Sequence, residues 1–494
     1  MPGLRTLSQS AHKKGKQKVI APVKELQTYL ESFSDFEKVA VGHDQAWLRD
    51  LRAEAFARFC EVGLPTTRDE DWRFTNISAI AQTQFRLAAK TEVAKNSVAD
   101  LRATQAACQL VFVNGHFVPE LSALEKLPKG VTVNGLAAEI AQKSAHVENH
   151  LGRYLNIQRD AFSALNTAFA EDGAFVHVHR GTVVEQPIYL LFISQVSTAR
   201  GSDGVTQPLP QTVPTDAPTM NHPRNLFVIE EESQVAIIED YVSIGDTAGS
   251  LCNTATELVA KDGAIVSHYM IEREHKQSFN ISTLRIEQGR NANVASHSVL
   301  LGGGIVRNNV HPVLAGEGSE CLINGLFVGN GKQHLDNYML VEHAQPHCSS
   351  RQFYNGILDD SSHGVFHGRI IVHKDAQKTD AKQTNRNLLL SDNAQIDTKP
   401  QLEIYADDVK CTHGATIGQI DETALFYLRS RGIDEASARK LLLMAFANEC
   451  LDRMKEDSIR SGIEKLLSNL QFGSGSGPTT LNASDGGRNW QEVG

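Results

Sequence analysis

The sequence lacks several features that mark common functional classes. Its longest apolar runs, 188–193 and 441–447, fall far short of the roughly 20 residues that a membrane-spanning helix needs. Acidic residues outnumber basic ones, 58 to 48, which gives a formal net charge of −10. Nucleic-acid binding proteins need a basic surface that displaces counterions from phosphates. The composition therefore predicts a soluble, globular chain with neither a membrane nor a nucleic acid as its partner.

Cysteine is present, but its spacing excludes two common structural uses. The seven cysteines are odd in number, and no two of them form a C-x-x-C pair. This argues against a disulfide framework and against a zinc site that one chain completes by itself. We therefore expect a reducing, cytoplasmic location. Residues 1–22 are basic and contain no acid, which we interpret as a disordered N-terminus or, as the weaker alternative, an organelle transit peptide.

Motifs for nucleotide and hydrolase chemistry are also missing. The sequence contains no G-x-x-x-x-G-K-[ST] phosphate loop, no G-x-S-x-G nucleophile motif and no H-E-x-x-H zinc motif. The three consecutive glycines at 302–304 lie between two strand-like runs, which favours a tight turn over a phosphate-binding loop. We expect no independent nucleotide hydrolysis.

The hydrophobic pattern divides the chain into regions of different structure. Helical periodicity predicts a helical domain over 23–172, with a short hairpin that turns at Asn114-Gly115. Short β-type runs separated by Gly, Asp and Asn predict a β region over 173–420. Five prolines indicate a flexible loop insertion at 196–224. The last regions are a helical domain over 421–472, with Asp421 and Asp434 as helix N-caps, and a disordered tail over 473–494.

The β region has two possible architectures. No amphipathic segment of helical length interrupts about 240 residues, so alternating β-α-β units are excluded. Stacked antiparallel sheets and a parallel β-solenoid both remain. The runs have no fixed repeat length, and periodicity alone does not decide between the two.

Histidine and cysteine are the chemically distinctive residues of this region. Cys411 and His413 are two apart, so in a strand both side chains point to the same face. A thiolate beside an imidazole suits iron, zinc or the edge of an iron–sulfur cluster. Two ligands do not complete a tetrahedral site, so the remaining ligands are expected from another chain. For the neighbouring histidines and cysteine we favour structural roles: His343, His347, Cys348, His363 and His367.

The C-terminal region contains a helix that is apolar on more than one side. Its main apolar face includes Leu443, Phe446, Ala447 and Cys450, and further apolar residues at 441, 442 and 444 widen this face. We expect another helix or a partner protein to cover it.

Several long motifs resemble the SufB/SufD family of iron–sulfur cluster assembly proteins. They are LEIYADDVKCTHGATIG at 402–418, ALFYLRSRG at 424–432, GRIIVHKDAQKTDAKQTN at 368–385, and GLP with EDW at 63–65 and 70–72. The segment around Cys411 and His413 is similar to the SufD branch, because the SufB pattern has a Glu-His-Glu-type sequence there. The resemblance covers roughly residues 25–470.

This resemblance implies a fold, a function and partners. The core would be a right-handed parallel β-helix flanked by helical domains at both ends. The chain would be a non-catalytic scaffold subunit that pairs with SufB through the β-helix, or with itself where SufB is absent. His413, with Cys411, would bind a nascent iron–sulfur cluster or iron transiently and share it with SufB, so the isolated chain would hold no stable cluster. The C-terminal domain would bind the ATPase SufC, with Leu443, Phe446, Ala447 and Cys450 as expected contacts.

Two other functions are weighed against this one. A β-helix enzyme of the secreted type that acts on acidic polysaccharides would cluster carboxylates in a groove. A self-contained metalloprotein would retain metal when purified alone.

Overall fold

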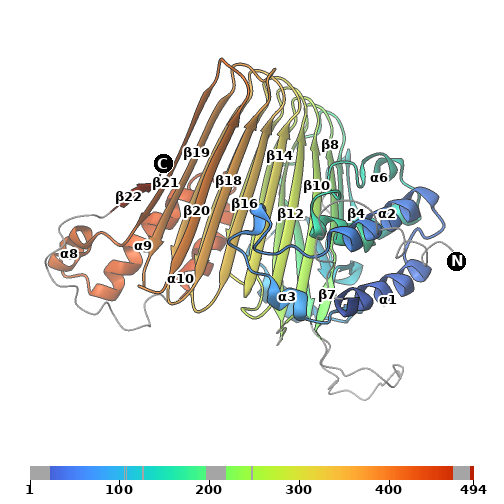
Figure 1. The fold of residues 1–494 in the computed structure, drawn as a ribbon, viewed down its shortest axis with the longest axis horizontal. Helices are drawn as coiled ribbons and strands as arrows, with labels where there is room; N and C mark the ends of the chain where they lie inside the picture. Colours follow the sequence, from blue (N-terminus) through green and yellow to red (C-terminus); the bar gives the residue numbers. More distant parts are fainter. Residues whose placement is uncertain are drawn as a thin grey trace.

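Two long, mostly parallel β-sheets form the body of the molecule. The computed structural model describes residues 23–470 except 105, 107, 125–126, 196–217, 246 and 248, together with residues 490–493. Each sheet has 11 strands, and consecutive strands along most of the chain alternate between the two sheets. Strands of one sheet therefore stack on strands one coil earlier, as Figure 1 shows. This is a β-solenoid of about 7 turns, which confirms the parallel β-helix and rejects the stacked antiparallel alternative.

The strands fall into sheets A and B. Sheet A contains β1 (Arg86–Leu87), β4 (Val131–Gly135), β5 (Ala174–Val178), β7 (Thr219–Asn221), β8 (Arg224–Ile229), β10 (Leu251–Ala260), β12 (Phe279–Gln288), β14 (Ile305–Leu314), β16 (His334–His343), β18 (His363–Val372) and β20 (Gln395–Ile404). Sheet B contains β2 (Cys108–Val113), β3 (His116–Phe117), β6 (Ile188–Gln195), β9 (Gln234–Ile244), β11 (Ile265–Arg273), β13 (Asn293–Leu300), β15 (Glu320–Gly329), β17 (Ser349–Leu358), β19 (Asp380–Leu389), β21 (Lys410–Gly418) and β22 (Trp490–Val493).

Columns of in-register side chains fill the space between the sheets. One such inner column of sheet B runs through Val235, Val266, Val294, Cys321, Ser350, Ala381 and Cys411. Successive members are 27 to 31 residues apart, because the turns between strands differ in length. This variation explains why the sequence shows alternation without a fixed repeat.

The N-terminal region supplies strands as well as helices. Its helices are α1 (Val23–Val39), α2 (Ala46–Val62), α3 (Ser78–Gln82), α4 (Lys95–Leu101), α5 (Leu136–Ala141), α6 (Ala145–His150) and α7 (Ala161–Ala168), with 3-10 turns η1 (Glu70–Trp72) and η2 (Pro119–Leu121). The predicted hairpin is confirmed: β2 and β3 pair antiparallel around Asn114 and Gly115, whose φ angles are 52° and 83°. Strand β2 also pairs parallel with β6, and β4 pairs antiparallel with β5. Residues 23–172 are thus partly built into the two sheets.

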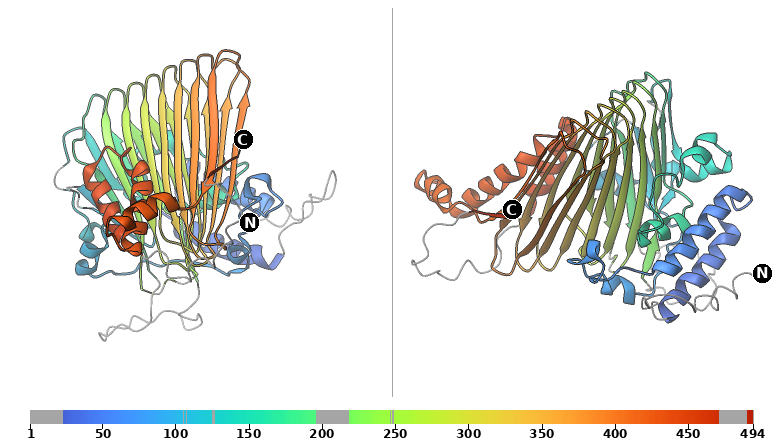
Figure 2. Two further views of the ribbon diagram at one scale, coloured as in Figure 1. Left: turned by 90° about the vertical axis from the view of Figure 1, so that its left-hand side faces the viewer. Right: turned by 45° about the horizontal axis from the view of Figure 1, so that its top comes forward.

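The C-terminal helices α8 (Glu422–Ser430), α9 (Glu435–Leu451) and α10 (Asp457–Ser468) follow the last coil. Asp421 and Asp434 accept backbone N–H bonds at the starts of α8 and α9, as predicted. Helices α9 and α10 lie along the outer face of sheet B, and α8 projects beyond the last strands (Figures 1 and 2).

The four apolar side chains expected to contact a partner are instead part of the chain's own core. Leu443, Phe446, Ala447 and Cys450 are each at most 6% exposed and pack against sheet B. The Cys450 thiol donates to the carbonyl of Gly325 at 3.1 Å. Their assignment as partner contacts is therefore corrected: the outer face of sheet B covers them, and a partner would not reach them.

Several expectations fall partly or wholly outside the described residues. These are the basic segment 1–22, most of the loop insertion, and most of the tail. Residues 219–221 were predicted to belong to the flexible loop insertion. Instead they form strand β7, which pairs with β1 and β10. Four residues of the predicted tail form β22, which pairs antiparallel with β21. No helix in the described part of the chain is long and apolar enough to cross a membrane.

Candidate functional site

Cys411 and His413 lie at the final rung of the solenoid interior. Both are on β21, in register with Ala381 and Gln383 of β19, and strand alternation directs both toward the inner columns. Gln383 is 1% exposed, whereas His413 is exposed and Cys411 is half-buried. The difference arises because, in the described part of the chain, β22 pairs only with residues 415–418 of β21 and no strand stacks beyond residues 410–414.

Among the described residues, none covers the end of the solenoid around these two side chains. A side chain built at Gly414 would meet no described atom within 4 Å. Behind His413 the polar column continues inward, where Gln383 Nε2 donates to Gln352 Oε1 at 2.9 Å. The prediction that Cys411 and His413 share one face is confirmed, and both lie at an end of the solenoid where another molecule can reach them.

Burial affects the chemistry of Cys411. It raises the pKa of the thiol, and the backbone N–H of Ala381 only partly opposes this shift. The free side chain is therefore a thiol at neutral pH, and binding of iron would displace its proton. His413 is exposed to solvent beside it. The pair offers one sulfur and one nitrogen ligand, half of a tetrahedral set.

The neighbouring histidines favoured as structural residues have partners within the fold. His343 is buried, and its Nε2 lies 2.8 Å from Ser350 Oγ. His363 Nε2 lies 2.8 Å from Asp397 Oδ2. His367 packs edge-on against the ring of Tyr338, 4.9 Å between centroids. The interpretation of these three as structural residues agrees with the geometry.

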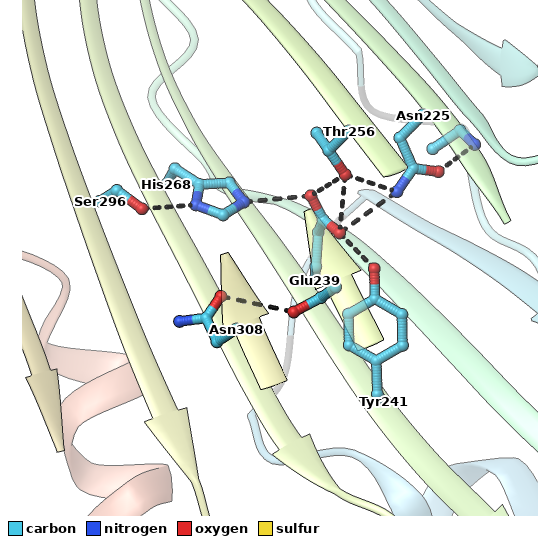
Figure 3. Close-up of polar contacts among 9 residues, drawn as sticks. Asn225, Glu239, Tyr241, Thr256, His268, Ser296 and Asn308 are labelled. Atoms are coloured by element: carbon cyan, nitrogen blue, oxygen red, sulfur yellow. Dashed lines mark hydrogen bonds and ion pairs between the residues drawn. The ribbon is translucent and has the colours of Figure 1, made fainter. Parts of the chain in front are cut away.

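A buried polar cluster inside the solenoid was not foreseen from the sequence. Its centre is Glu239 of β9, which is 2% exposed (Figure 3). Asn225 Nδ2 and Thr256 Oγ1 donate to its carboxylate at 3.2 and 3.0 Å, and the Tyr241 hydroxyl donates as well. His268 Nε2 lies 3.0 Å from Glu239 Oε1. The carboxylate thus has partners from four strands of both sheets.

The cluster contains an acid, an imidazole and a hydroxyl in series. His268 Nδ1 lies 3.0 Å from Ser296 Oγ, so Glu239, His268 and Ser296 follow the order of a hydrolytic triad. All three are at most 3% exposed. The adjoining cavity has a volume of about 20 Å³, enough for one water molecule. A substrate cannot enter, so the cluster orients interior side chains.

Two further buried carboxyls lie where sheet B meets the glycine-rich turn. Burial, and then repulsion by Glu274, raises the pKa of Glu272 to about 8. Burial raises the pKa of Glu274 to about 7. Gly302 N donates to Glu272 Oε2 at 3.2 Å, and a Cβ at Gly302 would lie 2.4 Å from the backbone N of Glu274. The glycines therefore form a tight turn, as predicted.

Comparison with known proteins gives two family-level matches. The model described as "SUF system FeS cluster assembly, SufBD core domain" matches residues 212–446, and "SufBD protein N-terminal region" matches residues 23–190. An iron–sulfur cluster assembly SufBD family protein of Synechocystis is 33% identical over 453 residues, which cover 90% of this chain and 95% of that protein.

The chain belongs to the SufBD family of iron–sulfur cluster assembly proteins. The iron–sulfur cluster assembly protein SufD of Escherichia coli is 33% identical, with 81% of this chain and 88% of that protein covered. Protein ABCI7, chloroplastic, of Arabidopsis thaliana is 30% identical, with 84% and 83% covered. SufBD membership confirms the resemblance read from the motifs, and it leaves the polysaccharide-enzyme alternative without support.

Proposed function

We propose that this SufBD protein is a SufD-type, non-catalytic scaffold subunit that works with SufB and the ATPase SufC in the cytoplasm. Cys411 and His413 would supply part of the ligand set for a nascent iron–sulfur cluster or iron, held transiently between this chain and SufB. The observation that carries the proposal is the position of the two ligands: adjacent on one face and accessible at the open last rung.

The strand edges at this end support a partner chain. Strand β20 and residues 410–414 of β21 are edges of their sheets in the described part of the chain. Unpaired backbone N–H and C=O groups at a sheet edge bind readily to a strand of another molecule. A second solenoid placed there would bring its own side chains beside Cys411 and His413 and complete the coordination.

The surface proposed here for SufC binding differs from the predicted one and lies on α8 and the start of α9. Phe426 and Tyr427 of α8 are 72% and 56% exposed, and Leu441 of α9 is 52% exposed. Phe426 and Tyr427 are consecutive residues, and large apolar side chains exposed together mark protein contact sites. Helix α8 also projects beyond the solenoid (Figure 1), where a partner can reach it.

Co-expression with SufB and SufC tests the proposal. We expect a stable complex on gel filtration and, after anaerobic isolation, both iron and acid-labile sulfide. The double variant Cys411→Ala/His413→Ala should still form the complex but lose the cluster, and Cys60→Ala, which changes a half-buried cysteine elsewhere, should keep it. A chain that stays alone beside both partners, or undiminished cluster yield in the double variant, contradicts the proposal.

The isolated chain provides a second test. We expect it to hold no acid-labile sulfide, because its ligand set is incomplete. A stable cluster in the chain alone would refute the shared site. For SufC, Phe426→Ser should weaken the complex while leaving the fold intact, since that side chain is mostly exposed.

A further inference from the structure

A second group of side chains that could ligate a metal lies at the opposite end of the solenoid from Cys411 and His413. It consists of His146 on α6, His177 on β5 and Glu230 directly after β8. One potential ligand atom from each of the three lies within 4.8 Å of the other two. His177 Nε2 is 3.2 Å from Glu230 Oε1, and the rings of His146 and His177 are 4.0 Å apart between centroids.

The local fold explains why these residues meet. Phe175 and His177 alternate to the outer face of sheet A, where Phe175 packs in one cluster with Val147 of α6. Val147 is 1% exposed and anchors α6 against the sheet, which leaves its neighbour His146 beside His177. Val178 is in parallel register with Ile229, so the residue after Ile229 reaches the same edge.

The group is open to solvent on one side. His177 is buried. Glu230 is half-buried and His146 is exposed, so an ion can enter from solvent on the side of α6.

We propose that His146, His177 and Glu230 bind one divalent first-row transition-metal ion of the Zn²⁺ or Fe²⁺ class. Metal–nitrogen bonds of about 2.1 Å place tetrahedral ligand atoms roughly 3.4 Å apart. The His177 and Glu230 ligand atoms are already 3.2 Å apart, and His146 is exposed, so its side chain is free to adjust. The exposed His179, whose ring lies 4.5 Å from that of His177, offers a fourth nitrogen. A set of mostly imidazole ligands disfavours Ca²⁺ and Mg²⁺, which take oxygen ligands.

The bound ion would join α6 to the first coil of the solenoid. This site is separate from the proposed cluster site, since the two lie at opposite ends of the stack of strands (Figure 1). It also needs no sulfur ligand and no partner chain. Its test can therefore succeed or fail independently of the proposed role in cluster assembly.

Titration of the full-length chain with Co²⁺ tests the site. The parent for this experiment is Cys411→Ala/His413→Ala, which removes the other proposed ligands. We expect one equivalent of Co²⁺ to bind with a visible d–d absorption band. Adding His146→Ala should weaken binding by at least about tenfold, since even the loss of an outer partner of a ligand costs 10–100-fold. The matched control His43→Ala changes another exposed histidine, whose Nδ1 lies 3.2 Å from the Ala40 carbonyl oxygen, and it should leave binding unchanged.

Thermal unfolding gives a second readout. Zn²⁺ should raise the Tm of the parent and of His43→Ala but not that of His146→Ala, because an ion that binds only the folded chain stabilises it. His146 is exposed, so its substitution leaves the fold intact. Absence of a stoichiometric Co²⁺ band in the parent, or equal Co²⁺ affinity in the parent and His146→Ala, would overturn the proposal.

Discussion

The buried ion pair of Arg224 and Glu257 gives the sharpest test of what holds the N-terminal end together. Both side chains are 0% exposed, and Arg224 Nη2 lies 2.6 Å from Glu257 Oε2. The Glu257 carboxylate also accepts backbone N–H bonds from Gly152, Tyr154 and Leu155, at 2.8 to 3.3 Å. The pair thereby fastens the loop after α6 to strands β8 and β10.

Glu257→Gln removes the negative charge with almost no change in shape. Removing one partner of a buried ion pair costs about 3–5 kcal/mol, because the other charge is left uncompensated. Arg224 Nη1 keeps its bonds to Asn166 Oδ1 and Thr167 Oγ1, at 3.2 and 3.0 Å. We therefore expect a loss of unfolding free energy near the lower limit, about 3 kcal/mol. Urea denaturation followed by circular dichroism measures it, and hydrogen exchange should speed up at the amides of residues 152–155.

A second pair and a double variant make the result decisive. Arg351 and Asp380 are 2.7 Å apart but 45% and 48% exposed, so Asp380→Asn should cost at most about 1 kcal/mol. Arg224→Met/Glu257→Gln should be less destabilised than Glu257→Gln alone, since no unpaired charge remains. If Glu257→Gln cost no more than Asp380→Asn, burial would not be the source of the energy and the reasoning would fail.

Three further predictions concern the solenoid interior and its helical cover. Glu272 and Glu274 have pKa values of about 8 and about 7 in the folded chain, whereas unfolded glutamates lose their protons near pH 4.5. The folded chain therefore binds more protons than the unfolded chain between these values. The free energy of unfolding should fall as pH rises from about 5 to 8. Glu272→Gln should flatten this pH dependence. Urea melts that show constant or rising stability over this range would contradict the prediction. Phe446→Ala should cost about 3–5 kcal/mol in thermal or urea unfolding by opening a cavity between α9 and sheet B, and a near-neutral result would mean that α9 is held by other contacts. Gly302→Ala should cost about 1–3 kcal/mol because its Cβ meets backbone, whereas Gly414→Ala should be neutral, and equal effects in chemical denaturation would refute the tight packing of the turn.

Local pattern was sufficient for the class of structure and for part of the site. Alternation in the β region and the absence of helical periods excluded β-α-β units, and the caps at Asp421 and Asp434 were correctly placed. The two-residue spacing of Cys411 and His413 was enough to put both on one face, because strand alternation is a property of the backbone alone. Their exposure was not predictable, since it depends on β21 being the last rung.

Contacts between successive coils of the solenoid could not be predicted from the local sequence pattern. Glu239, His268 and Ser296 are roughly 30 residues apart in succession, yet they form one hydrogen-bonded series. Which residues stack is set by the lengths of the intervening turns, and these vary. For the same reason, the contact between His146 and His177 could not be predicted from the sequence.

Helix α9 shows most clearly which features follow from the local sequence and which depend on the tertiary structure. The sequence predicts that its apolar faces are covered, because removing apolar side chains from water is energetically favourable. The sequence by itself determined the alternating strands, the helix ends and the paired thiol and imidazole, because each depends on residues within a few positions of one another. Only the tertiary structure decided that sheet B covers Phe446 and its neighbours, and which charged side chains lie together inside and outside the solenoid, because those outcomes depend on the register of distant coils.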